Sequence, residues 1–93
     1  LVYAPEMDFK TLDLYDLMGK IGKPDLIIGS SMGGYVADIL GSHLGVDVLL
    51  FNPALHSRSI EIDSDGEIYG DKNYKRTIIL GTEDDVLKFI SGA

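Results

Sequence analysis

Apolar residues recur at helical spacing in two segments of the chain. Within Leu14–Ile21 they stand three and four positions apart, which predicts an amphipathic helix, with Asp8 or Thr11 as the residue that caps its start. Within Met32–Leu44 the apolar positions again share one helical face. Gly45 follows directly and predicts a left-handed end for this second helix.

Short apolar segments occur elsewhere, at residues 1–3, 26–28, 46–51, which is interrupted only by Asp47, and 77–80. Such runs are typical of strands that are covered on both faces. Two of them flank the helix at Met32–Leu44, and a strand, a helix and a strand in succession predict a βαβ unit on a parallel sheet. We therefore expect an α/β fold of the three-layer, Rossmann-like kind, with parallel strands and flanking helices, in one domain over residues 1–93.

Residues 57–76 follow a different pattern. Ile60 and Ile62 alternate with polar residues before the tight-turn dipeptide Asp65-Gly66, and Ile68 and Tyr69 follow it. A small exposed hairpin is therefore expected. The acidic run that begins at Asp63 does not fit a calcium-binding loop. An EF-hand requires glycine at the sixth position of the loop, and Ile68 stands there.

The composition narrows the range of partners. Eight Lys and Arg residues against fifteen Asp and Glu residues give a net charge of −7, which argues against nucleic acid or an anionic membrane. The absence of cysteine excludes disulfides and thiolate metal sites. No apolar run approaches the roughly 20 residues that span a bilayer. We expect a cytoplasmic protein that uses no metal and no cofactor.

The turn between the apolar run at 26–28 and the second helix reads Gly29-Ser30-Ser31-Met32-Gly33. This matches G-x-S-x-G, the nucleophile elbow, in which a sharp strand-to-helix turn exposes the hydroxyl of the central serine, here Ser31. Glycines two positions before and after that serine let the strand and the helix pass closely. The N–H of Met32 would then face an acyl oxyanion at the helix N-terminus. Ser30 does not fit the pattern, because Ile28 stands two positions before it.

Two other uses of this turn stay open at this point, one in helix–sheet packing alone and one in phosphate binding. A Walker loop requires Gly-Lys-Ser/Thr, but no lysine lies between Lys23 and Lys72, and Gly-x-Gly-x-x-Gly is absent. The favoured hypothesis is a serine hydrolase. Its rivals are a non-catalytic binding module or pseudoenzyme on the same scaffold, and a nucleotide-binding protein.

A catalytic serine needs an imidazole base, and the imidazole needs a carboxylate that orients it. The acidic run after the last predicted strand is the place to look for that carboxylate, and Asp84 is the candidate, with Glu83 and Asp85 as its competitors. The alternative interpretation is a solvated acidic loop that caps a helix at Val86–Ile90.

These motifs resemble those of the α/β-hydrolase superfamily and, more narrowly, of the small bacterial YqiA-like esterases. The resemblance is carried by residues 28–35, by Asn52-Pro53-Ala54 and by residues 84–87. It implies that Ser31 is the nucleophile, Asp84 the acid and the N–H of Met32 one oxyanion donor. It also implies a small-molecule ester or acyl substrate, including thioesters.

Two parts of such an enzyme are missing from the sequence: an opening His-Gly loop and a closing Gly-His loop. We therefore expect residues 1–93 to be the middle of a longer protein, a partial α/β-hydrolase domain whose catalytic histidine lies outside this chain. His43 falls near the packed face of its helix and is interpreted as structural. His56 follows the strand that ends at Phe51, on the same sheet edge as Ser31, and is the candidate for the base within this chain.

Overall fold

Two helices and five strands make up the part of the chain that the computed structural model describes, residues 2–5, 8, 11–52, 69–80 and 86–92. In chain order the elements are β1 (Val2–Tyr3), α1 (Leu14–Ile21), β2 (Leu26–Ser30), α2 (Met32–Leu44), β3 (Asp47–Phe51), β4 (Arg76–Ile79) and β5 (Val86–Ile90). The mixed α/β class is confirmed, and both helices lie where the apolar pattern predicts them. Gly45 ends α2 with the predicted left-handed backbone, at a φ of 69°.

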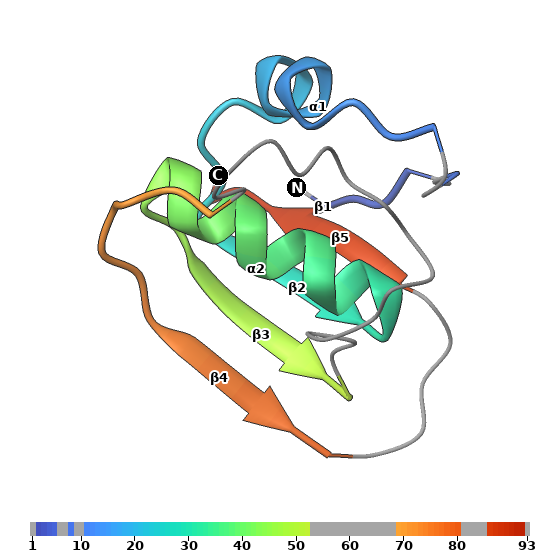
Figure 1. Ribbon diagram of the computed structural model, residues 1–93, viewed down its shortest axis with the longest axis vertical. Helices are drawn as coiled ribbons and strands as arrows, with labels where there is room; N and C mark the ends of the chain where they lie inside the picture. Colours follow the sequence, from blue (N-terminus) through green and yellow to red (C-terminus); the bar gives the residue numbers. More distant parts are fainter. Residues whose placement is uncertain (1, 6–7, 9–10, 53–68, 81–85, 93) are drawn as a thin grey trace.

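The strands lie in one sheet in the order β1-β5-β2-β3-β4, and Figure 1 shows α2 lying across one face of it. The pairs β2–β3 and β3–β4 are parallel. In contrast, β5 runs antiparallel to both of its neighbours, β1 and β2. The sheet is therefore mixed, and the expectation of parallel strands throughout is wrong at β5.

The predicted βαβ unit is present as β2, α2 and β3. The two strands pair along their whole length, from Leu26 opposite Asp47 to Ser30 opposite Phe51. The next strand, β4, continues this parallel arrangement and places Ile79 opposite Phe51. The carboxyl ends of β2, β3 and β4 therefore lie side by side at one edge of the sheet.

Residues 86–90 form a strand, and the helix expected there is wrong. Leu87 and Phe89 are only 4% and 3% exposed, whereas Lys88 between them is exposed. This alternation has the period of a half-buried strand. Pairing along all of β2 also satisfies backbone groups that an isolated helix of five residues could not, since so short a helix is unstable in water.

The core lies between α2 and the sheet face that α2 covers. Its buried apolar side chains are Leu17, Ile27, Val36, Ala37, Leu40, Val46, Val48, Leu50, Leu87 and Phe89. On the opposite face of β2 and β3, Leu26, Ile28, Leu49 and Phe51 are only half-buried. Because α1 contributes Leu17 to the same core as α2, the described residues show no second helical layer, and the expected three-layer arrangement is not seen in them.

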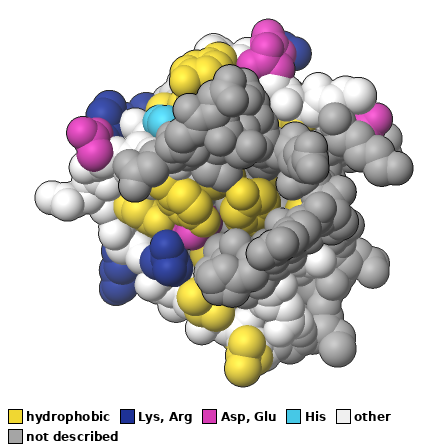
Figure 2. All heavy atoms as spheres, in the orientation of Figure 1, with side chains coloured by type: hydrophobic (Ala, Val, Ile, Leu, Met, Phe, Trp, Pro, Cys, Tyr) yellow, Lys and Arg dark blue, Asp and Glu magenta, His cyan; other side chains and the backbone are white. Residues whose placement is uncertain are grey.

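The edge strand β4 is exposed along its whole length. Ile78 and Ile79 are 45% and 43% exposed, and Leu80 just beyond the strand is 83% exposed. Figure 2 shows hydrophobic side chains protruding at the lower edge of the view, where Figure 1 places β4. Natural proteins usually cover or charge such an edge, so the described residues leave this side of the sheet incompletely protected.

Asp13 caps α1. Its carboxylate accepts hydrogen bonds from the N–H groups of Tyr15 and Asp16, at 3.0 and 3.1 Å. The expected caps, Asp8 and Thr11, lie before the helix starts, and the N–H of Thr11 instead donates to the Asp8 carbonyl. The cap was misplaced because the apolar spacing locates the buried face of a helix and not its first residue.

Candidate active site

Ser31 stands at the junction of β2 and α2 and has a backbone conformation that is rare for serine. Its φ is 56° and its ψ is −120°, a region that residues other than glycine seldom occupy. Such strain costs about 1–3 kcal/mol and persists only where the surrounding structure imposes it. Here β2 is paired on both sides and α2 begins at the next residue, so the strand-to-helix turn imposes the conformation.

The ordinary role of a serine before a helix is to cap it, and Ser31 does not do so. A capping serine has an extended backbone and accepts a hydrogen bond from the first helical turn. The Ser31 side chain makes no capping hydrogen bond. The residue is held through its backbone: its carbonyl accepts from the N–H groups of Gly34 and Tyr35 at 3.1 and 3.3 Å, and its N–H donates to the Phe51 carbonyl at 3.0 Å. The half-buried side chain is therefore not engaged in capping.

Gly29 lies where β2 passes close to the first turn of α2. A Cβ atom on Gly29 would lie 2.7 Å from the carbonyl carbon of Gly33 and 2.7 Å from the Cα of Gly34. Both obstacles are backbone atoms, so no side-chain rotation could relieve the overlap. The glycine two positions before Ser31 is thus required by the close approach of strand and helix, for the reason that the motif predicts.

Met32 is the first residue of α2 and is half-buried. Its N–H belongs to the first turn of the helix, where the positive end of the helix dipole is found. An amide in this position can stabilise an oxyanion. The assignment of Met32 as an oxyanion donor stays a prediction.

Ser30 is adjacent to Ser31 but lies in a different environment. It is 2% exposed, and its hydroxyl has no hydrogen-bond partner among the described residues. Side chains alternate along a strand, so Ser30 faces the same side of the sheet as Leu26 and Ile28, away from α2. A buried hydroxyl cannot reach a substrate in this conformation, so the environment favours Ser31 over Ser30 as the nucleophile.

His43 is too far from Ser31 to serve as its base. The two residues are separated by 43 − 31 = 12 positions along α2, which corresponds to about 18 Å of helix axis. His43 is half-buried in the last turn of α2, where a basic side chain suits the negative end of the helix dipole. This placement fits a structural role.

The remaining candidates lie outside the described residues: His56, Glu83, Asp84, Asp85 and the acidic run that begins at Asp63. Of the predicted site, the structure therefore brings together Gly29, Ser31, Met32 and Gly33. The described residues contain no group of three His, Asp or Glu side chains that could hold a metal ion. Within the same residues, neither helix is long and apolar enough to cross a membrane.

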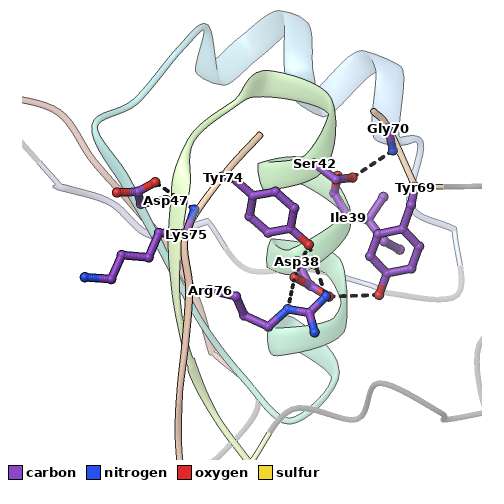
Figure 3. A network of polar contacts seen from close by, with 9 residues as sticks. All are labelled: Asp38, Ile39, Ser42, Asp47, Tyr69, Gly70, Tyr74, Lys75 and Arg76. Atoms are coloured by element: carbon purple, nitrogen blue, oxygen red, sulfur yellow. Dashed lines mark hydrogen bonds and ion pairs between the residues drawn. The ribbon is translucent and has the colours of Figure 1, made fainter. Parts of the chain in front are cut away.

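Asp38, in the middle of α2, forms a polar network that sequence reasoning missed (Figure 3). Its carboxylate is completely buried and accepts hydrogen bonds from the hydroxyls of Tyr69 and Tyr74, at 3.0 and 2.7 Å. It also accepts one from Nε of Arg76 at 2.9 Å. The sequence feature that could have revealed this network is an aspartate within an otherwise apolar part of a helix, because a carboxylate is buried there only when it is paired.

The segment before β4, residues 69–75, is fastened to α2 by this network and by two further contacts. The N–H of Gly70 donates to the Ser42 hydroxyl at 2.8 Å, and the N–H of Lys72 donates to the Ser42 carbonyl at 3.0 Å. The segment forms no strand, and these contacts hold it against α2. Apart from Tyr69, the residues that carry the hairpin prediction, around Asp65-Gly66, lie outside the described residues.

Burial and the neighbouring carboxylate change the acidity of the two tyrosines. Burial raises the pKa of Tyr69 well above its usual value, and the charge of Asp38 raises it further. Burial and the hydrogen bond to Asp38 also raise the pKa of Tyr74, against the opposing effect of Arg76. Both hydroxyls therefore remain protonated donors to Asp38 at neutral pH, and one cation and two neutral groups together satisfy the carboxylate.

The fold and the turn define an α/β protein with a serine on a strained strand-to-helix junction, at the carboxyl edge of a mixed sheet. The family described as "Uncharacterised protein family (UPF0227)" matches residues 13–88, and the chain belongs to this family. UPF0227 is the family of YqiA-like proteins, which agrees with the resemblance noted in the motifs. Membership by itself assigns no activity. The chain matches no curated protein and no solved structure.

Proposed function

We propose that the protein is a serine esterase of the α/β-hydrolase superfamily, with Ser31 as its nucleophile. The observation that carries this proposal is the backbone of Ser31, with φ 56° and ψ −120° and a side chain that caps nothing. A serine used only for packing or capping gains nothing from strain. A nucleophile does, because the sharp turn exposes its hydroxyl at the carboxyl edge of the sheet.

In the proposed reaction, Oγ of Ser31 attacks the carbonyl carbon of a carboxylic ester or thioester while a base takes the hydroxyl proton. The N–H of Met32, at the N-terminus of α2, stabilises the oxyanion that forms. Collapse of this intermediate expels the alcohol or thiol, which receives the proton from the base, and leaves an acyl group on Ser31. Water activated by the same base then hydrolyses the acyl-enzyme and restores the serine.

We propose Asp84 as the acid and a histidine outside the described residues as the base. Asp84 follows β4, and the carboxyl end of β4 lies at the same sheet edge as Ser31 because β2, β3 and β4 are parallel. His56 follows β3 in the sequence and is the candidate within the chain. A histidine beyond residue 93 is the alternative that the family resemblance suggests.

The test is labelling by a fluorophosphonate probe, applied to the natural full-length protein. Ser31→Ala should abolish labelling and lower the hydrolysis of p-nitrophenyl acetate by several orders of magnitude, as loss of a nucleophile does. Ser30→Ala is the matched control and should retain both, since Ser30 is buried on the other face of the sheet. Equal labelling of the two variants would refute the assignment. A wild-type protein that neither labels nor hydrolyses esters would favour the binding module.

A further inference from the structure

Met32 follows Ser31 directly and carries a thioether at the proposed catalytic turn. It is half-buried at the start of α2. Among the described residues, the half-buried hydrophobic side chains that pack against the core are Leu12, Leu14, Met18, Ile21, Leu44 and Tyr74. Met18 on α1 is therefore part of the core packing, and Met32 is not. A large apolar side chain beside the proposed nucleophile thus does not serve the packing of α2 against the sheet.

Methionine sulfur is the group that a mild oxidant attacks most readily in this chain, because residues 1–93 contain three methionines and no cysteine. Met32 and Met18 are both half-buried, so neither sulfur belongs to a completely enclosed side chain. Met7, the third methionine, lies outside the described residues. Oxidation to the sulfoxide converts a flexible apolar side chain into a polar one, and it is reversible because methionine sulfoxide reductases restore the thioether.

The turn at Ser31 has little room to absorb such a change. Strand and helix already touch through their backbones, since a Cβ atom on Gly29 would lie 2.7 Å from the carbonyl carbon of Gly33. A half-buried sulfoxide oxygen costs free energy unless it gains a hydrogen bond, so the oxidised side chain has to move. Met32 is the first residue of α2, and its N–H moves with it. An oxyanion donor acts only at about 2.7–3.1 Å from the oxyanion, so a displaced N–H loses its effect.

We propose that Met32 is a redox-sensitive residue through which hydrogen peroxide reversibly lowers the activity at Ser31. This inference rests on the proposed esterase function. A lone pair on Sδ of Met32 attacks one oxygen of the peroxide, and a new S–O bond forms as the O–O bond breaks. The second oxygen leaves with both hydrogens as water. The sulfur is oxidised by two electrons and the peroxide is reduced by two, so no further reactant is needed.

The test treats the natural full-length protein, Met32→Leu and Met18→Leu with hydrogen peroxide under the same conditions. For each protein, kcat for p-nitrophenyl acetate is compared with its own untreated value, and peptide mass spectrometry reports the oxygen gained at each methionine. Loss of one oxyanion donor lowers turnover about 10²–10³-fold, so displacement of the Met32 N–H should lower kcat by about tenfold or more. The wild-type protein and Met18→Leu should show this loss, and Met32→Leu should not. Methionine sulfoxide reductase should restore the activity of the wild-type protein.

Three results would overturn the inference and leave the esterase standing. The first is an equal loss of activity in Met32→Leu and in the wild-type protein. The second is an unchanged kcat although Met32 has gained an oxygen atom. The third is a loss of activity that accompanies unfolding in circular dichroism, because the fold and not the site would then be the target. Failure of the untreated wild-type protein to hydrolyse esters or to react with a fluorophosphonate would refute the esterase and the inference with it.

Discussion

Removal of Arg76 should destabilise the protein more than neutralisation of Asp38, because the two partners differ in exposure. The Asp38 side chain is 0% exposed, whereas the Arg76 side chain is 41% exposed. In Arg76→Met the carboxylate stays buried, and among the described residues only the hydroxyls of Tyr69 and Tyr74 remain as donors. In Asp38→Asn the guanidinium loses its counter-charge but can turn towards water, and the amide keeps the shape of the carboxylate.

The expected free energies of unfolding follow from this difference. Removing one partner of a fully buried ion pair costs about 3–5 kcal/mol, and the exposure of Arg76 reduces this to about 2 kcal/mol for Arg76→Met. Asp38→Asn weakens charge-assisted hydrogen bonds and should cost about 1 kcal/mol. The double variant leaves no buried charge, so its cost should be about 1.5 kcal/mol and not the sum of about 3 kcal/mol, a coupling of about 1.5 kcal/mol.

Urea denaturation of the four proteins, followed by circular dichroism at neutral pH, measures this cycle. The exposed pair of Asp16 and Lys20 on α1, whose side chains are 61% and 63% exposed, supplies the control. Lys20→Met should leave the unfolding midpoint nearly unchanged, because an exposed pair contributes little. If the costs of the two single variants sum to the cost of the double variant within about 0.4 kcal/mol, the reasoning is refuted, because Asp38 and Arg76 would then act independently.

Three further changes test other parts of the structure. Gly29→Ala should abolish fluorophosphonate labelling and lower the urea midpoint, because the new Cβ meets backbone atoms at 2.7 Å, whereas Gly19→Ala on α1, with nothing within 4 Å, should be neutral or stabilising. Stability should fall as the pH rises above about 10, because the unfolded chain then releases the Tyr69 proton that the raised pKa retains in the folded state. Tyr69→Phe should flatten this decline in urea midpoints measured at about pH 8.5 and 10.5, and an unchanged slope would contradict it. Asp84→Asn should reduce ester turnover far more than Asp85→Asn, with both variants folded by circular dichroism, and the reverse order would shift the acid by one residue.

The sequence was informative where burial is decided locally. A helix with one buried face and a strand buried within a sheet leave different apolar periods, so α2, β2 and β3 were predictable to within one or two residues. For α1 the buried face was predictable but the first residue was not. The turn at Ser31 was predictable for a related reason. Glycine at position 29 indicates a close backbone contact, because any other residue would place a Cβ atom there. That contact is present between β2 and the first turn of α2.

The sequence was misleading where contacts with residues distant in the chain determine the local structure. Residues 86–90 are too few to reveal a period, and they form a strand because β2 lies beside them to pair with. The Asp38 network depends on Tyr74 and Arg76, which follow Asp38 by 36 and 38 positions in the chain and reach it only once the segment before β4 lies along α2. The sequence of α2 does not predict these partners. It shows only a charged residue at a position where an apolar residue is expected.

The Asp38 network and the proposed catalytic turn lie in different parts of α2, and this separation has a testable consequence. Asp38 is seven positions beyond Ser31, about 10 Å along the helix axis. The network holds the start of β4, at Arg76, whereas Ser31 lies at the carboxyl edge of the strands. Variants of the network should therefore lower stability without changing the rate at which a fluorophosphonate labels Ser31, provided that labelling is measured at a temperature where each variant is folded. A labelling rate that falls in Arg76→Met but returns in the double variant with Asp38→Asn would instead mean that the buried charge distorts β4 along its length, and would show that the network also positions the catalytic edge.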